Sequence, residues 1–165
     1  MTTKNQTDFK KDLPSKKITV TRNFNAPLEK VWRAWTESEL LEQWWAPKPW
    51  SAETKTMNFT EGGYWHYAMV GPDGTKMYAR VDFKIIRVHD YFTAKDSFCD
   101  EAGNINIDFP SNDWKNNFYR TDTGTKVIVE LVFSSEADLL KIVEMGFEQG
   151  FAMAHTNLDE LLKTL

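Results

Sequence analysis

The stretch EKVWRAWTESELLEQWWAPKPW, from Glu29 to Trp50, holds five of the seven tryptophans of this 165-residue chain. Its first half predicts an amphipathic helix, because apolar residues recur at the spacing i, i+3, i+4, i+7 that puts them on one face. These residues are Leu28, Val31, Trp32 and Trp35. A stripe of this kind has to be buried in a soluble domain, so Trp32 and Trp35 are predicted to be core residues.

The second half of the stretch predicts another short helix. Ser38 is a typical N-cap residue, and Pro47 and Pro49 would end the helix because proline cannot continue it. Trp44 and Trp45 are adjacent on this helix, so their side chains point in different directions. One of them can pack inward while the other faces a cavity or a partner.

Most of the remaining chain alternates apolar and polar residues with the period of two that is typical of strands. Turn-forming residues separate these segments, most clearly the run Gly71-Pro72-Asp73-Gly74. Consecutive strands joined by short turns form an antiparallel sheet. In segment 76–88 the alternation predicts that Phe83 and Ile85 share one face. The predicted strands are residues 17–24, 50–58, 64–70, 76–88, 91–98, 114–120 and 126–133.

The last 30 residues return to a helical period after a Ser cap. Apolar residues follow at alternating spacings of three and four, which predicts one long amphipathic helix. They are Phe147, Phe151, Ala154, Leu158, Leu161 and Leu165. Gly146 and Gly150 have no side chains, so together they leave a nearly bare patch on this helix. The class is therefore α+β, with the helices on one face of a sheet that encloses volume beneath the last helix.

Three stretches carry a resemblance to a known family: FNAPLEKVWRAWTESELLEQWWAP, GGYWHYAMVGPDG and MGFEQGFAMAHTNLDELL. In this order and spacing they resemble the START-like (SRPBCC) superfamily. Within it, the chain is similar to the homologues of the activator of the heat-shock-protein-90 ATPase, which are related to polyketide cyclases. The resemblance covers residues 16–165 as one domain, and we expect residues 1–15 to be a flexible tail.

The resemblance implies a helix-grip fold, in which a curved antiparallel sheet of about six to seven strands wraps around a long C-terminal helix. Two short helices follow the first strand, and an apolar cavity lies between sheet and helix. Members of the superfamily include small-molecule binders, cyclases, hydrolases, stress-response proteins and a co-chaperone domain. The family supplies no catalytic motif that could be carried over to this chain.

The leading functional hypothesis is binding of a small hydrophobic or aromatic ligand in that cavity. The strand YWHYAMV puts Trp65, Tyr67 and Met69 on one face, which we expect to face the helix. Aromatic rings with a polar tip and a soft thioether suit an organic ligand, and they also suit an ordinary core. The full set of ligand-binding candidates is Trp44, Trp45, Trp65, Tyr67, Met69, Tyr78, Phe151 and His155.

Two alternatives stay open. His155 lies on the apolar stripe of the last helix, and as a general acid or base it would make the protein a cyclase-like or hydrolase-like enzyme with Tyr67 or Tyr78 as an orienting donor. A co-chaperone-like module would instead use an exposed surface around Trp44 and the Pro47–Pro49 loop to bind a chaperone partner. A homodimer is also compatible with the aromatic surplus.

Composition argues against several other classes. The net charge of −4 and the scattered basic residues argue against nucleic acid as a partner. The chain has a single cysteine, Cys99, and three histidines far apart, so we expect neither a disulfide nor a metal site. No motif indicates a cofactor. No apolar run is long enough for a signal peptide or a membrane span, so we expect a cytoplasmic protein and no membrane partner.

Overall fold

The computed structural model describes residues 6–165, which form one sheet and four helices. The strands alternate apolar and polar residues as the sequence predicts, and the helices carry apolar stripes. In chain order the elements are β1 (Asp8–Asp12), β2 (Lys17–Phe24), α1 (Leu28–Thr36), α2 (Ser38–Trp44), β3 (Ser51–Met57), β4 (Tyr64–Val70), β5 (Lys76–Arg87), β6 (Tyr91–Cys99), β7 (Asn112–Thr121), β8 (Gly124–Phe133), α3 (Glu136–Glu144) and α4 (Phe147–Leu162).

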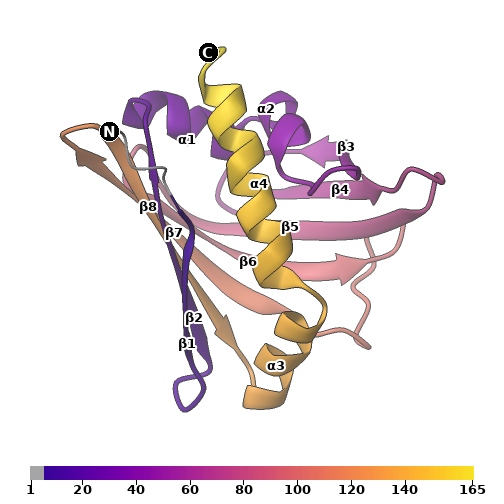
Figure 1. Ribbon diagram of the computed structural model, residues 1–165. Helices are drawn as coiled ribbons and strands as arrows, with labels where there is room; N and C mark the ends of the chain where they lie inside the picture. The colour runs from indigo at the N-terminus through magenta and orange to yellow at the C-terminus, as the bar shows by residue number, and fades with distance from the viewer. Residues whose placement is uncertain (1–5) are drawn as a thin grey trace.

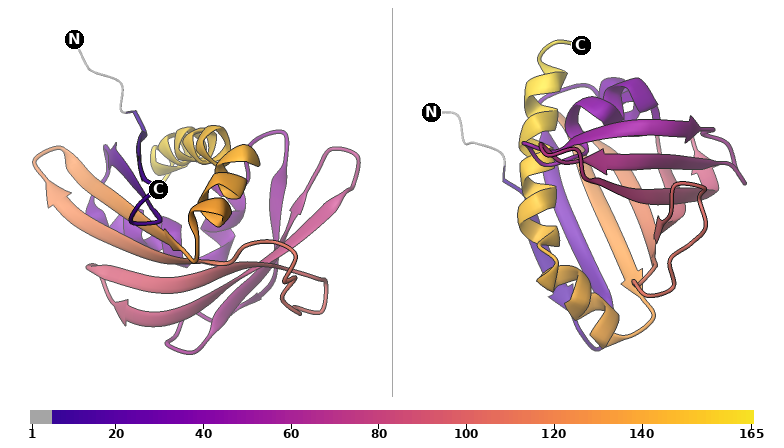
Figure 2. Two further views of the ribbon diagram at one scale, coloured as in Figure 1. Left: turned by 90° about the horizontal axis from the view of Figure 1, so that it is seen from below. Right: turned by 90° about the vertical axis from the view of Figure 1, so that its right-hand side faces the viewer.

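The sheet is antiparallel throughout, with the strand order β1-β2-β8-β7-β6-β5-β4-β3. It curves strongly, and α4 lies across its concave face (Figures 1 and 2). At about 1.5 Å per residue the 16 residues of α4 span roughly 24 Å. The structure is therefore the expected helix-grip fold, with a sheet that does not close into a barrel.

Helices α1 and α2 close one end of the concave face, beside the C-terminal half of α4 (Figure 1). The indole Nε1 of Trp44 donates a hydrogen bond of 2.9 Å to the carbonyl oxygen of Ala34, which fixes α2 against α1. The amide of Asn157 on α4 donates to the carbonyl of Ala46 at 3.2 Å. Buried hydrogen bonds of this kind hold the three helices in one arrangement, because losing either partner would leave a buried polar group unsatisfied.

The core fills the space between the sheet and the helices on the side of β2, β8 and α1. Ile18, Leu131 and Leu158 have no exposed surface there. Trp32 and Trp35 are 5% and 4% exposed and belong to this core, packed edge-to-face against Phe118. A partly buried ion pair between Arg22 on β2 and Asp159 on α4 adds a polar link from the sheet to the helix.

Three features differ from the sequence-based expectation. The sheet has eight strands instead of six to seven, because residues 8–12 of the expected flexible tail form β1 and pair with β2. Phe9 on β1 packs edge-to-face against Phe147 of α4, which gives this strand an apolar contact beyond its backbone pairing. The first five residues of that tail lie outside the described residues.

The second difference is in the last helix. Gly146 adopts a left-handed conformation with φ of 92° and separates α3 from α4, so the predicted single helix is two. The third is on β5, where a register shift between Phe83 and Ile86 turns Ile86 toward the core and leaves Ile85 43% exposed. A bulge adds one residue to a strand and so reverses the faces beyond it. Within residues 6–165 no helix has the length and apolar character needed to cross a membrane.

Leu158 offers a test of the packing between α4 and the sheet. We expect Leu158→Ala to lower the free energy of unfolding by about 2–5 kcal/mol, because it leaves a cavity in a fully buried site. Met153→Ala on the exposed side of the same helix should change it by less than about 0.5 kcal/mol. Urea unfolding followed by circular dichroism measures both. If both variants lower the free energy of unfolding equally, the packing of Leu158 against the sheet does not hold α4 in place.

Candidate functional site

A cavity of about 280 Å³, here called the main cavity, lies between the sheet and the junction of α3 and α4. The core does not fill this part of the concave face. Gly146 and Gly150 lie on its helix side, and a Cβ atom on Gly150 would meet only Cγ of Pro47, at 3.7 Å. The bare patch expected from the two glycines therefore faces the sheet across an open space.

The wall of the main cavity is mostly apolar and aromatic. Strands β4 to β7 contribute Tyr67, Met69, Met77, Ala79, Phe98 and Trp114, whereas Trp45 and Pro47 come from the end of α2, and Ile142, Met145, Phe147 and Phe151 come from α3 and α4. Met77 and Met145 are each 44% exposed, so the cavity opens to solvent beside them. Flexible methionines at a mouth can adapt to ligands of different shape.

Trp45 and Tyr67 form the polar contact at the α2 end of the wall. Trp45 Nε1 donates a hydrogen bond of 2.9 Å to the hydroxyl oxygen of Tyr67. Burial, followed by the nearby charge of Asp96, raises the pKa of Tyr67 well above its usual value, so the phenol keeps its proton. That proton is not used in the bond from Trp45, so it is available to a ligand.

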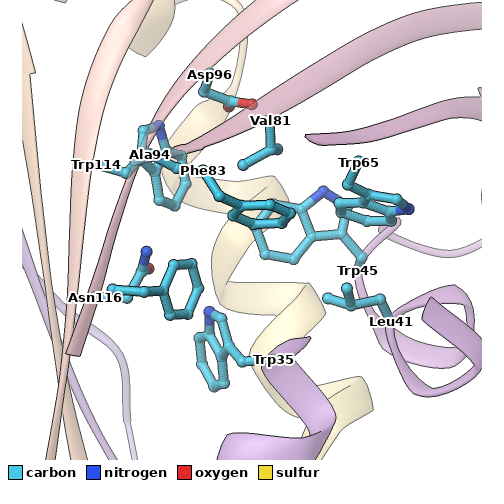
Figure 3. Close-up of a pocket in the computed structure, with 11 residues that line it drawn as sticks. Trp35, Leu41, Trp45, Trp65, Val81, Phe83, Ala94, Asp96, Trp114 and Asn116 are labelled. Carbon is cyan, nitrogen blue, oxygen red and sulfur yellow. The ribbon is translucent and has the colours of Figure 1, made fainter. Parts of the chain in front are cut away.

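A second and much smaller space, the inner pocket, adjoins the main cavity and has a volume of about 30 Å³ (Figure 3). Trp45, Asp96 and Trp114 lie on the walls of both spaces, so the two spaces meet at these residues. Trp35 and Trp65 are also on the wall of the inner pocket, together with Asn116 on β7. A volume of this size matches one water-sized group.

Asp96 is a titratable wall residue that was not among the candidates from the sequence. On β6 it follows Phe92 and Ala94 at a spacing of two, so it points to the concave face with them. Its Oδ1 is buried and has no hydrogen-bond partner among residues 6–165. Burial, and then the negative charge of Asp82, raise the pKa of Asp96 to about 7. The signal in the sequence was a carboxylate on the apolar face of an alternating strand.

Five of the candidates from the sequence lie around these two spaces. Tyr67, Met69 and Phe151 are on the wall of the main cavity, Trp65 is on the wall of the inner pocket, and Trp45 is on both. Trp65 and Tyr67 stack on each other with ring centroids 3.9 Å apart. They share one face of β4 and do belong to the concave side of the sheet.

Trp44 and Tyr78 lie elsewhere, against the expectation for these two residues. Trp44 has no exposed surface and serves the contact between α1 and α2, so it cannot anchor the expected chaperone-binding surface either. Tyr78 is on the opposite face of β5 from Ala79, beside His66 and Lys55. On that outer face Arg80 and Asp82 form a half-exposed ion pair at 2.6 Å.

His155 is inside the core and on neither cavity wall. Its Nδ1 is 2.9 Å from the hydroxyl of Thr7, and rings of Phe24, Trp35 and Phe151 surround it. Burial, and then the charge of Arg22, lower the pKa of His155 to about 3, so the ring is neutral. A neutral histidine without access to the cavity does not meet the geometry that an acid–base role needs.

Metal ligands do not gather in the part of the chain that the structure describes. Among residues 6–165 no three His, Cys, Asp or Glu side chains lie close enough together to hold a metal ion. Cys99 is buried at the end of β6, where burial raises the pKa of its thiol to about 11. Apart from the indoles, the polar side chains on the walls of the two spaces are Tyr67, Asp96, Ser97, Asn112 and Asn116.

Comparison with known proteins gives a consistent picture. The model of the family described as "Activator of Hsp90 ATPase homolog 1-like protein" matches residues 25–163. No curated protein matches the chain.

Several solved structures are similar along nearly the whole chain. A solution structure from Arthrobacter aurescens has 30% sequence identity and a TM-score of 0.89, with 96% of this chain and 92% of that chain covered. A crystal structure from Mycobacterium smegmatis has 30% identity and a TM-score of 0.88, covering 95% and 96%. A solution structure from Staphylococcus epidermidis has 29% identity and a TM-score of 0.83, covering 94% and 93%.

The raised pKa of Asp96 predicts a pH-dependent stability. The folded protein holds this proton up to about pH 7, whereas the ordinary value is 3.8, so stability falls as the pH rises through that window. Asp96→Asn removes the effect. The stability of this variant relative to wild type should rise by on the order of 2–4 kcal/mol between pH 4 and pH 8. Urea unfolding at several pH values measures this difference, and Asp122→Asn in the exposed β7–β8 turn is the control. If the difference in stability between Asp96→Asn and wild type does not change with pH, Asp96 does not have the raised pKa.

The lowered pKa of His155 predicts the opposite dependence of folding stability on pH, in acid solution. Its pKa is about 3 in the folded protein against an ordinary 6.5, so stability is lost as the pH falls below about 6.5. His155→Gln should be less sensitive to acid by on the order of 3 kcal/mol between pH 6.5 and pH 4. The same unfolding measurements test this, with the exposed His89→Gln as the control. Parallel acid slopes for wild type and His155→Gln would show that His155 is not a neutral buried residue.

Proposed function

The chain belongs to the family of Activator of Hsp90 ATPase homolog 1-like proteins, and on that basis we propose that it binds a small, largely apolar ligand in the main cavity. The observation that carries the proposal is the unfilled space beneath α4. Its volume of about 280 Å³ is close to the lower bound of small-molecule sites, which is roughly 300 Å³. A ligand of one or two fused rings suits this size.

The character of the wall supports an aromatic or alicyclic ligand. Trp114, Phe147 and Phe151 come from opposite sides of the cavity, and their rings contact one another at centroid distances of 5.4–6.2 Å. Because these rings already contact one another, they form one continuous aromatic side of the wall, against which a flat ligand can lie. The exposed Met77 and Met145 at the mouth provide the way in from solvent.

Ligand binding is favoured over the two other functions considered from the sequence. The enzyme hypothesis needs His155 to meet Tyr67 or Tyr78 at one substrate position, and the three residues lie in the core, on the cavity wall and on the outer face of the sheet. The co-chaperone hypothesis needs Trp44 on the surface, and this residue is fully buried. Only the cavity brings several candidates together.

Gly150 allows the cavity to be filled without harming the helix. We expect Gly150→Leu to abolish binding of the neutral fluorophore N-phenyl-1-naphthylamine, because the new side chain extends from α4 into the main cavity. Replacing glycine within a helix also gains up to about 1 kcal/mol of helix propensity, so the variant should remain folded. Fluorescence titration measures binding, and circular dichroism measures folding.

Two further variants make this test specific. Gly150→Ala adds one methyl group and should weaken binding only slightly, whereas Ala79→Phe should block the cavity from the sheet side. Native mass spectrometry of gently purified protein would reveal a co-purifying ligand. If wild type does not bind the fluorophore, or if Gly150→Leu and Ala79→Phe bind it as well as wild type, the main cavity is not the binding site.

A further inference from the structure

Two indoles in the wall of the main cavity donate hydrogen bonds to polar side chains of the same wall. Trp45 Nε1 donates to the hydroxyl oxygen of Tyr67 at 2.9 Å, and Trp114 Nε1 donates to Oδ1 of Asn112 at 2.6 Å. All four residues line the main cavity. Each indole therefore occupies an acceptor of its neighbour and leaves the neighbour's own donor, the phenol O–H or the amide N–H, for another partner.

The phenol proton of Tyr67 has no acceptor within the part of the chain that the structure describes. Among residues 6–165 the hydroxyl takes part in one hydrogen bond, the one that it accepts from Trp45. Tyr67 is 3% exposed, so bulk solvent reaches little of it. A buried donor without a partner is destabilising. A ligand that fills the main cavity displaces the solvent left there, so it has to supply an acceptor or leave this proton unpaired.

The contacts of Tyr67 place its hydroxyl end, and not only its ring, at the wall. The ring stacks on Trp65 at a centroid distance of 3.9 Å, which holds it along the concave face of β4. Trp45, which is bonded to the hydroxyl, lines the main cavity. Burial, and then the charge of Asp96 on the same wall, raise the pKa of Tyr67, so the carboxyl is close to the phenol. The phenol oxygen therefore lies near two other residues of the wall.

The same wall limits the charge of the acceptor. No Lys, Arg or His side chain of residues 6–165 lines the main cavity, so a carboxylate or a phosphate would have no counter-ion there. Asp96 would also repel an anion whenever its own carboxyl is ionised. The neutral carbonyl oxygen of a ketone, an ester or an amide avoids both costs. An ammonium group has no acceptor and would leave the phenol proton unpaired.

We propose that the hydroxyl of Tyr67 donates a hydrogen bond to a neutral carbonyl oxygen of the ligand, so that the main cavity takes aromatic or alicyclic carbonyl compounds. This inference rests on the ligand binding proposed above. The rings of the ligand lie against Trp114, Phe147 and Phe151, and the carbonyl points to the α2 end of the cavity. Trp45 joins the two regions, because it contacts Trp114 at a centroid distance of 6.0 Å and holds the phenol oxygen.

Three probes of nearly the same shape test the acceptor. 2-Acetylnaphthalene carries a carbonyl oxygen, 2-isopropenylnaphthalene carries a methylene group in its place, and 2-naphthoate carries a charged carboxylate. Displacement of N-phenyl-1-naphthylamine, followed by fluorescence at pH 7, gives the affinity of each probe. A ketone and an alkene differ in hydration, so the decisive quantity is the change in their affinity ratio on mutation. The carboxylate should bind more weakly than the ketone.

Tyr67→Phe removes the hydroxyl and keeps the ring. The ketone-to-alkene affinity ratio should fall roughly tenfold in this variant, which is the effect of one buried hydrogen bond, while the alkene binds about as well as before. Tyr64→Phe is the matched control, because it makes the same change on the same strand. Tyr64 lies on the outer face of β4 with its ring 4.4 Å from the guanidinium of Arg80, and this variant should keep the wild-type ratio. Thermal melts followed by circular dichroism establish that both variants are folded.

Infrared spectroscopy of the bound ketone gives a readout that a purely structural role of Tyr67 would not change. A hydrogen bond to a carbonyl oxygen lowers the stretching frequency of the C=O bond, and an isotope label separates this band from those of the protein. The band should lie at a lower frequency in wild type and in Tyr64→Phe than in Tyr67→Phe.

The outcomes distinguish this inference from the proposed function. An unchanged affinity ratio in Tyr67→Phe, or the same band position in all three proteins, overturns the carbonyl contact and leaves ligand binding intact. Tighter binding of 2-naphthoate than of the ketone overturns the neutral acceptor. If wild type binds none of the three probes, the proposed function fails and the carbonyl contact fails with it.

Discussion

The packing of α4 against the concave face of the sheet is tight at one end and open at the other, and the properties of the molecule depend on this difference. At the C-terminal half, Leu158 and His155 are enclosed by the core, and Asn157 ties the helix to the end of α2. At the N-terminal half, Gly146 and Gly150 supply no side chains. The sheet curves away there, so the main cavity stays open between the helix and the sheet.

The tryptophan-rich stretch serves both ends of this arrangement. Trp32 and Trp35 stabilise the closed end as part of the core, and Trp44 joins α1 to α2. Trp45 is the next residue after Trp44 but points the other way, into the wall between the main cavity and the inner pocket. Its hydrogen bond to the hydroxyl of Tyr67 fixes the orientation of the indole in this wall.

Two buried titratable groups give this interior an unusual electrostatic character. Burial is the main reason that the pKa of Asp96 is raised to about 7 and that His155 is kept neutral. An interior that disfavours charge on both an acid and a base also disfavours any other charged group, because that group would lose its hydration without gaining a counter-ion.

The sequence by itself determined the fold class and most of the strands, because periods of two and of 3.6 residues report directly which face of an element is buried. It also identified Trp45, Trp65, Tyr67, Met69 and Phe151, which lie on the walls of the two cavities. It could not separate Trp44 from Trp45, since adjacent helical residues look alike until the neighbouring elements are placed. Tyr78 and His155 were misplaced for the same reason: their surroundings come from distant segments.

Only the tertiary structure decided which polar side chains line the two spaces. Asp96, Asn116 and Trp35 are far apart in the chain, and each looks ordinary in its own element. Curvature of the sheet brings β6 and β7 under α1, and this places all three side chains on the wall of the inner pocket. Local periodicity fixes which way a side chain points, whereas the depth of a cavity and the partners within it depend on how far the sheet bends.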